Sequence, residues 1–200
     1  VFDESGAEVY RPVNPTAFSG EAIGKGGYQH FMLKEIYEQP QVIGDCLNSF
    51  LNPATRTVTL PDLGFSLKGV PKITLIACGT SYYAAMVAKY WIEGLARISV
   101  EVDIASEFRY RQAAMPEGGV AVFISQSGET ADTLAALRYA RAQGQHIVSI
   151  VNVPESTIAR ESDAVLPTNA GPEVGVASTK AFTTQLTVLA CLVIAMAKAN

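Results

Sequence analysis

Charged residues and histidines are scarce in this sequence. Only 17% of its 200 residues are charged, the formal net charge is −4, and the two histidines, His30 and His146, stand alone. Proteins that bind nucleic acid through its phosphates usually carry a basic patch, so we expect no nucleic-acid partner. Isolated histidines do not indicate a metal centre, because zinc needs several ligands close together. We therefore expect neither a metal nor a cofactor.

Cysteine is also rare and shows no pairing pattern. The three cysteines are Cys46, Cys78 and Cys191. Because they are odd in number, far apart and free of any CxxC spacing, they predict neither a disulfide framework nor a zinc site. Unpaired cysteines are typical of a reducing compartment, and the acidic first eight residues do not resemble a signal peptide. These features predict a cytoplasmic protein.

Long hydrophobic runs are missing as well. The most apolar stretch, residues 186–197, includes Thr187 and is shorter than the roughly 20 residues that a transmembrane helix needs. It predicts a buried helix instead, and we expect no association with a membrane. What the sequence does contain is 48% hydrophobic residues, which is enough to build a well-filled core.

The first 51 residues lack the regular pattern of the rest. Residues 1–27 predict a short strand-and-turn piece with its turn at residues 5–6, followed by a linker that contains prolines and glycines. A helix over residues 28–38 should end before Pro40, because the residue that precedes a proline avoids the helical conformation. A second helix is then expected over residues 41–51.

From residue 72 onward, short apolar runs alternate with stretches of helical spacing. Such runs suit strands that are covered on both faces, as in a parallel sheet. They predict five strands, at residues 73–78, 99–104, 120–124, 146–151 and 164–166. Helices are expected at residues 81–95, near Glu107, at 130–143 and over the apolar segment 182–196. The alternation predicts an α/β fold with a doubly wound five-stranded parallel sheet of order 2-1-3-4-5, preceded by N-terminal helices.

Hydroxyl-bearing side chains follow two of the predicted strands. In an open parallel sheet of this order, ligands bind beyond the carboxyl ends of the first and third strands. The loops at those ends lead into helices and supply Thr80, Ser81, Ser125, Ser127 and Thr130. A helix N-terminus presents unpaired N–H groups and about half a positive charge to an anion. Together these groups predict a site for a phosphate monoester, which neutral donors can hold without a basic patch.

Simpler interpretations exist for the same residues. Serine and threonine before a helix commonly act as N-caps, and Glu129 suits the first turn of a helix through its dipole. A third polar segment spans residues 173–180. There Ser178 or Thr179 can cap the last helix, and Lys180 is expected as a solvated surface lysine unless a ligand or an acidic partner holds it. A dinucleotide site is not indicated, because the first loop has one glycine where that fingerprint needs three.

The motifs resemble a known family. Three segments match the sugar isomerase (SIS) fold, and they are Cys78-Gly79-Thr80-Ser81, Ser125-Gln126-Ser127-Gly128-Glu129-Thr130 and Val176-Ala177-Ser178-Thr179-Lys180-Ala181-Phe182. Together with residues 30–40, they are similar to the first SIS half of the glutamine–fructose-6-phosphate aminotransferase family. Residues 1–12 resemble the last strands of that family's glutaminase domain. The resemblance implies that residues 1–27 are the end of a glutaminase domain plus a linker, and that residues 28–200 form the first SIS domain.

The resemblance also implies an activity and a role for individual residues. The family makes glucosamine-6-phosphate and glutamate from fructose-6-phosphate and glutamine. Carried over by motif, the phosphate would be held by Ser125, Gln126, Ser127 and Thr130. The sugar would be contacted by Thr80, Ser81, Ser178 and the backbone of Val176. No catalytic residue is assigned here, because the family's cysteine nucleophile lies upstream and its glutamate base, histidine and lysine lie downstream.

Two other functions and one assembly state follow as expectations. A single-domain SIS phosphosugar isomerase would need an acid–base pair inside these residues, and none is apparent. A regulator that senses sugar phosphates would carry a DNA-binding helix-turn-helix in place of the glutaminase-like opening. The apolar final helix needs cover on more than one side, either from its own domain or from a partner. We therefore expect the chain to associate as a homodimer.

Overall fold

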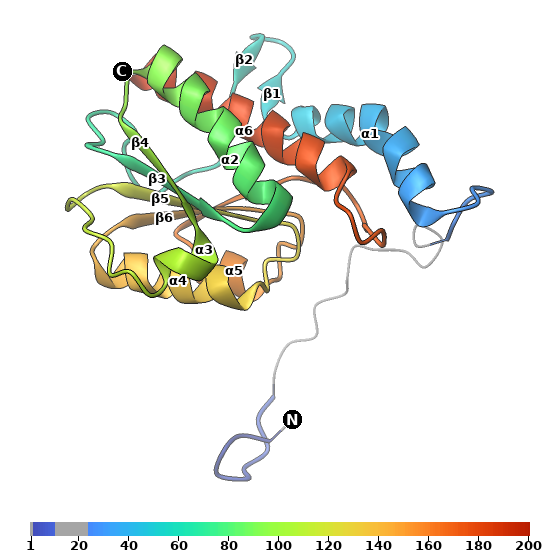
Figure 1. Ribbon diagram of the computed structural model, residues 1–200, viewed down its shortest axis with the longest axis horizontal. Helices are drawn as coiled ribbons and strands as arrows, with labels where there is room; N and C mark the ends of the chain where they lie inside the picture. Colours follow the sequence, from blue (N-terminus) through green and yellow to red (C-terminus); the bar gives the residue numbers. More distant parts are fainter. Residues whose placement is uncertain (1, 11–23) are drawn as a thin grey trace.

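The computed structural model of the protein describes residues 2–10 and 24–200, and its centre is a five-stranded parallel sheet (Figure 1). The strands are β3 (Ile73–Ala77), β4 (Val100–Ile104), β5 (Val120–Ser125), β6 (His146–Val151) and β7 (Ala164–Pro167). They lie in the order β4-β3-β5-β6-β7, and every neighbouring pair is parallel. Counted from the first strand of this sheet, the order is 2-1-3-4-5, which confirms the predicted doubly wound α/β fold.

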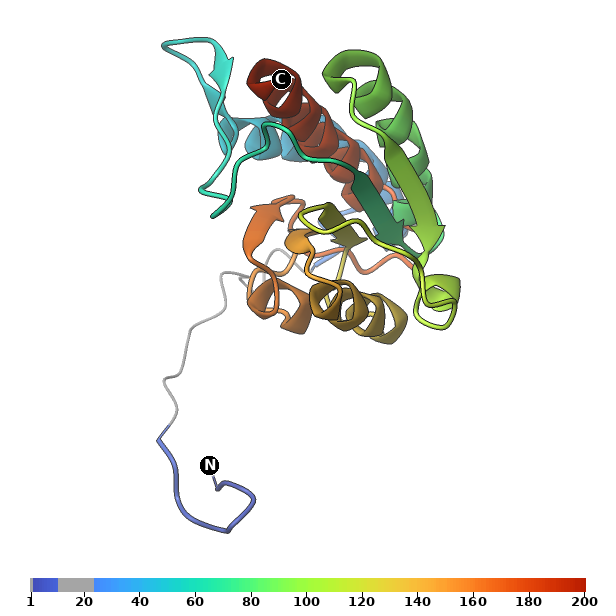
Figure 2. The ribbon, with the colours of Figure 1, turned by 90° about the vertical axis from the view of Figure 1, so that its left-hand side faces the viewer.

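Helices cover both faces of the sheet (Figures 1 and 2). One face carries α2 (Gly79–Trp91) and α6 (Lys180–Ala199), and α1 (Phe31–Asn48) packs beside α6. The opposite face carries α3 (Ala105–Phe108), α4 (Ala131–Ala142) and α5 (Thr157–Arg160). Because each crossover brings the chain back to start another parallel strand, the loops that follow the strands gather at one edge of the sheet.

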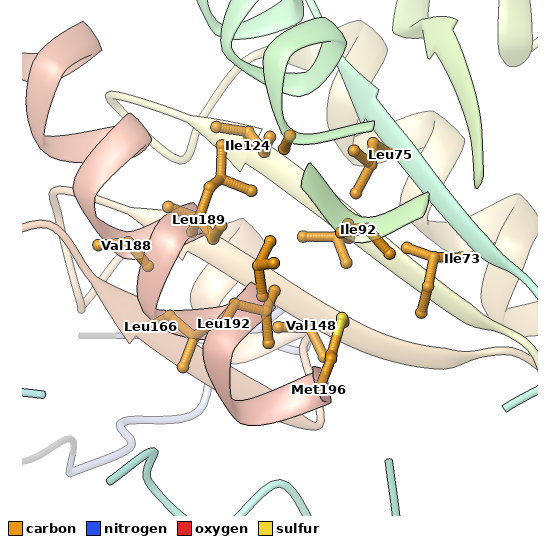
Figure 3. Close-up of a cluster of buried hydrophobic side chains, with 14 of the residues drawn as sticks. Ile73, Leu75, Ile92, Ile124, Val148, Leu166, Val188, Leu189, Leu192 and Met196 are labelled. Atoms are coloured by element: carbon orange, nitrogen blue, oxygen red, sulfur yellow. The ribbon is translucent and has the colours of Figure 1, made fainter. Parts of the chain in front are cut away.

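The core has two apolar layers, one on each face of the sheet. Adjacent side chains of a strand point to opposite faces, so Leu75 belongs to the cluster beneath α2 and α6, whereas Ile76 belongs to the cluster beneath α4. In Figure 3, Leu189 and Leu192 of α6 lie over strand residues that include Val148. All five residues of β3 are buried, which explains why this strand reads as a continuous apolar run.

Helix α6 is the central helix of the larger layer. Its 20 residues exceed the apolar stretch 186–197 that the sequence singled out, and by length and composition alone the helix could cross a membrane. In the structure, 56% of its most apolar 18-residue stretch is buried within the chain, against the sheet, α1 and α2. The prediction of a buried helix is therefore confirmed, and its cover comes largely from its own domain.

Over residues 24–51, which the structure describes, the N-terminal part has one helix where two were predicted. Helix α1 runs without a break through Pro40, so the predicted stop before this proline is wrong. A proline inside a helix leaves the carbonyl four residues earlier without its backbone donor. Here the Nε2 atom of Gln39 donates to that carbonyl, on Ile36, at 3.1 Å. The side chain thus replaces the missing bond, and packing of α1 against α6 keeps the helix continuous.

Several short elements were not predicted from the sequence. A two-stranded antiparallel hairpin of β1 (Leu51–Asn52) and β2 (Thr57–Val58) follows α1. The helix expected over residues 81–95 is α-helical only to Trp91 and continues as a π-helical turn, Ile92–Ala96. Helix α5, which has four residues, was also missed.

The beginning of the chain agrees with the predicted turn as far as it is described. Phe2 forms an antiparallel bridge with Glu8, and Gly6 between them has a φ of +81°. Glycine adopts this left-handed conformation without steric cost. Most of the predicted linker, residues 11–23, lies outside the described residues.

Candidate functional site

A crevice of about 450 Å³ opens beyond the carboxyl ends of β3 and β5. It is lined by all eight residues that the motifs selected, namely Thr80, Ser81, Ser125, Gln126, Ser127, Thr130, Val176 and Ser178. Thr80 and Ser81 lie in the first turn of α2, and the other six lie in the segments that lead into α4 and α6. No charged side chain is among the lining residues. An anion here would be held by hydroxyls, amides and two helix N-termini.

The first loop leads directly into α2. Gly79 has a φ of +57°, a left-handed conformation that favours glycine, and it is the first residue of the helix. Cys78 stands at the N-cap position and makes no capping hydrogen bond through its side chain. Thr80 is exposed and Ser81 is buried, and neither hydroxyl forms a hydrogen bond with another described residue. The capping interpretation therefore fails for this loop, and both hydroxyls can turn to a ligand.

Hydroxyls in the second loop shape their own backbone. Ser125 Oγ accepts from Gly128 N at 3.1 Å and lies 3.2 Å from Thr130 Oγ1. Ser127 Oγ accepts from Glu129 N at 3.2 Å. Thr130 is the N-cap residue of α4 but makes no side-chain capping bond, so the first N–H groups of α4 lack that partner. These contacts fold the loop into a cradle in front of the helix.

Gly128 allows this loop to pass close to the chain segment that follows β6. Its φ is +66°, and a Cβ atom at this position would lie 2.0 Å from Ser156 Oγ. Any larger residue would therefore displace either Ser156 or the loop. The glycine is required by geometry rather than by flexibility.

Thr133 is a lining residue that sequence reasoning missed. It lies in the first turn of α4, is 1% exposed, and its Oγ1 has no hydrogen-bond partner among the described residues. A buried hydroxyl without a partner is costly. The available signal was its spacing, since a residue three positions after Thr130 lies on the same helix face.

The third loop closes the crevice through Val176, Ala177 and Ser178. Val176 is fully exposed and lines the crevice, and the backbone contact that the motif assigns to it stays a prediction. Glu173 organises the loop by accepting from Thr179 N at 2.9 Å and from Ala181 N at 3.2 Å. Ser178 Oγ donates to the same carboxylate at 3.2 Å. Glu173 therefore caps α6, whereas the expected capping by Ser178 or Thr179 is wrong.

Lys180 is not the surface residue that the sequence suggested. It is 3% exposed, and its Nζ lies 2.7 Å from Glu38 Oε2. A lysine at a helix N-terminus opposes the helix dipole, so a buried position there needs a carboxylate partner. The partner is supplied by α1, which a reading of the loop alone could not reveal.

Glu129 does not serve the helix that follows it in the chain. Its Oε1 accepts from Thr157 N at 2.7 Å, at the start of α5. The Thr157 backbone hydrogen bond holds the pKa of this carboxyl below its usual value. The expected contribution to α4 is thus corrected to a contact with α5, and Glu129 does not line the crevice. Among the residues that the structure describes, no group of His, Cys, Asp or Glu could hold a metal ion.

Comparison with known proteins shows which family the chain resembles. The sequence profile of the SIS domain matches residues 66–195. Glutamine–fructose-6-phosphate aminotransferase (isomerizing) from Zymomonas mobilis is 61% identical over 184 residues, which are 92% of this chain and 30% of that protein. The protein of the same name from Bradyrhizobium diazoefficiens is 59% identical over an aligned length of 201, which covers 100% of this chain and 33% of that protein. The chain thus spans about a third of the length of these relatives.

A solved structure supports the same relationship. The C-terminal domain of glucosamine-fructose-6-phosphate aminotransferase from Francisella tularensis superimposes with a TM-score of 0.83 and 47% sequence identity. The match covers 88% of this chain and 49% of that one. At this identity the two chains resemble each other in sequence as well as in fold.

Proposed function

Because the chain belongs to the SIS domain family, we propose that its crevice binds a phosphorylated hexose. The observation that carries the proposal is the meeting of three hydroxyl-bearing loops at the N-termini of α2 and α4, with no carboxylate among the lining residues. A phosphate dianion needs several donors and would be repelled by a carboxylate. Helix N-termini and hydroxyls supply those donors without a basic side chain.

We assign the two ends of the ligand to different loops. The phosphate is assigned to the loop of Ser125, Gln126, Ser127 and Thr130, whose geometry makes a cradle before α4. The sugar is assigned to Thr80, Ser81, Ser178 and the Val176 backbone, which line the same crevice. No catalytic residue, metal or cofactor is assigned to the chain.

For the larger protein, we propose the reaction that its relatives' name describes. The chain would be the fructose-6-phosphate-binding half of the isomerase region of a glutamine–fructose-6-phosphate aminotransferase, which forms glucosamine-6-phosphate from fructose-6-phosphate and glutamine. The identity of about 60% to two such proteins supports this assignment. Residues 1–27 would then end a glutaminase domain and continue as a linker, and residues 28–200 would form the first SIS domain. A cytoplasmic location suits such a metabolic enzyme.

A homodimer is proposed on a different surface from the one the sequence indicated. Helix α6 is already packed against α1 and α2, whereas the outer face of α2 is not covered. Its exposed apolar residues recur at helical spacing and are Tyr83, Met86, Val87 and Tyr90. A contiguous apolar stripe of this kind is typical of a protein–protein interface. We propose that a second copy of the chain covers it.

Isothermal titration calorimetry with fructose-6-phosphate, inorganic phosphate and fructose tests the ligand. We expect fructose-6-phosphate to bind and fructose to bind much more weakly. Ser127→Ala removes a hydrogen bond to a charged group, which should lower the affinity for fructose-6-phosphate about 10- to 100-fold. Ser66→Ala is the matched control, because Ser66 Oγ makes the same kind of turn bond, to Lys68 N at 3.1 Å, outside the crevice. Equal affinity for fructose and its phosphate would refute the proposal.

A further inference from the structure

Glu35 is a buried carboxylate whose partners are backbone groups of a distant loop. Its side chain lies on α1 and is 2% exposed. Oε1 accepts from Val174 N at 2.6 Å and from Gly175 N at 3.0 Å, and Oε2 accepts from Gly175 N at 3.2 Å. These contacts join residues 139 and 140 positions apart in the sequence. A helix outside the sheet thus holds the loop that closes the crevice.

The contact is close enough to restrict which residues can stand at positions 35 and 175. Burying a carboxylate is costly unless hydrogen bonds replace its water, and here backbone N–H groups do so. A Cβ atom on residue 175 would lie 2.5 Å from Glu35 Oε2, so any residue larger than glycine would have to push the carboxylate aside. The loop therefore cannot shift away without leaving a buried charge unpaired.

A second carboxylate of α1 secures the other end of the loop. Glu38, one helical turn after Glu35, pairs with the buried Lys180 at the start of α6. The residues between the two fixed points include Val176 and Ser178, which face the crevice. Contacts with α1, rather than with the sheet, therefore hold both ends of this short segment in place.

We propose that Glu35 is a positioning residue for the hexose end of the ligand. It does not line the crevice, and it acts by fixing the backbone of residues 174–178, three of which line the crevice. The inference rests on the proposed function, since it takes the crevice to be the sugar site. The proposal predicts that different residues support the two parts of the ligand. Hexose contacts depend on Glu35, whereas phosphate contacts depend on the cradle, which Glu35 does not touch.

The test compares Glu35→Gln with the wild-type chain for two ligands. Glutamine keeps the shape of the side chain but has one acceptor oxygen, and its amide group faces N–H donors. We expect the affinity for fructose-6-phosphate to fall at least about tenfold, as for a lost hydrogen bond to a charged group. The affinity for inorganic phosphate should stay within twofold. Gly175→Ala should give the same split, because its Cβ displaces Glu35 from the other side.

A control variant separates positioning from general stability. Asp163 also accepts a backbone bond, from Ile147 N at 2.7 Å, but it lies away from the crevice. Asp163→Asn should therefore lower the melting temperature without changing the ratio of the two affinities. If Glu35→Gln leaves fructose-6-phosphate affinity within twofold, or lowers both affinities in parallel, the positioning role is wrong.

Amide hydrogen exchange provides a readout that needs no ligand. Glu35→Gln should speed exchange at residues 174–178 in the free chain, and Asp163→Asn should not. Unchanged exchange in the Glu35 variant would overturn the inference even if sugar binding fell. A wild-type chain that binds no sugar phosphate would refute the proposed function, and with it the role of Glu35 in sugar binding. Hydrogen exchange would still show whether Glu35 orders the loop.

Discussion

At the scale of single residues, five hydroxyls of the crevice fall into two groups. Ser125 and Ser127 accept backbone N–H bonds within their own loop and give the cradle its shape. Thr80, Ser81 and Thr133 make no such bonds among the described residues. A hydroxyl that is already engaged can still meet a ligand through its remaining capacity, because it has one donor and two acceptor sites. The unengaged hydroxyls have all of that capacity available.

Thr133 is the most informative of these residues. We expect Thr133→Val to raise the stability of the free chain by about 1 kcal/mol, because it removes a buried hydroxyl that has no partner. The same variant should bind inorganic phosphate roughly tenfold more weakly, through loss of one hydrogen bond to a charged group. Thermal unfolding and calorimetry measure the two effects. Ser149→Ala is the control, since its buried Oγ also lacks a partner but lies outside the crevice. A Thr133 variant with unchanged phosphate affinity would show that this buried hydroxyl does not contact the phosphate.

The sequence predicted the loop residues of the site but not the residues that hold them. Strand position grouped five hydroxyl residues, because the carboxyl ends of neighbouring parallel strands must meet, and the family resemblance added Gln126, Val176 and Ser178. All eight line one crevice, and their roles in binding stay predictions. Glu35 and Glu38 gave no local signal, since their partners lie about 140 residues further along the chain. Lys180 was placed wrongly for the same reason. Long-range pairing of charges cannot be deduced from spacing alone.

At the scale of elements, helix α1 shows how packing outweighs a local rule. Pro40 costs a backbone hydrogen bond, and a break at this position was a reasonable expectation. The helix nevertheless continues, because its buried face contacts α6 and Gln39 satisfies the free carbonyl. Glu35 and Glu38 both precede Pro40 and lie one turn apart on the same face of α1, where both reach the third loop.

The exposed stripe on α2 allows a prediction about assembly. Tyr90, which is 74% exposed, should be buried in the homodimer, so Tyr90→Asp should weaken association by about 2 kcal/mol or more, roughly 30-fold. Sedimentation velocity over a range of concentrations measures this shift. Tyr110→Asp is the matched control, because Tyr110 is 73% exposed but lies outside the stripe, after α3. A wild-type chain that stays monomeric, or a Tyr110 variant that dissociates equally, would contradict the proposed surface.

At the scale of the whole molecule, the fold follows from the alternation of buried strands and amphipathic helices. The five parallel strands and their order were predictable, because apolar runs alternating with helical periods allow few other arrangements. The hairpin of β1 and β2 and the π-helical turn after α2 were not, since they are too short to set a period. These additions lie away from the crevice lining, so the site could be predicted better than the periphery.

The crevice has residues assigned to binding and none assigned to catalysis. We therefore predict that this 200-residue chain does not form glucosamine-6-phosphate from fructose-6-phosphate, even with excess ammonia. Moving a proton between neighbouring carbons of the sugar needs a base that is free and held close to the reacting atoms. Glu173 is the carboxylate nearest in sequence to the third loop, and its oxygens already accept from Thr179 N, Ala181 N and Ser178 Oγ. Glu129 is directed to Thr157 N at the start of α5. A coupled assay with concentrated protein should therefore detect no product above a blank without protein. Turnover that is abolished by Glu173→Gln but not by the control Glu129→Gln would show that this half carries its own base.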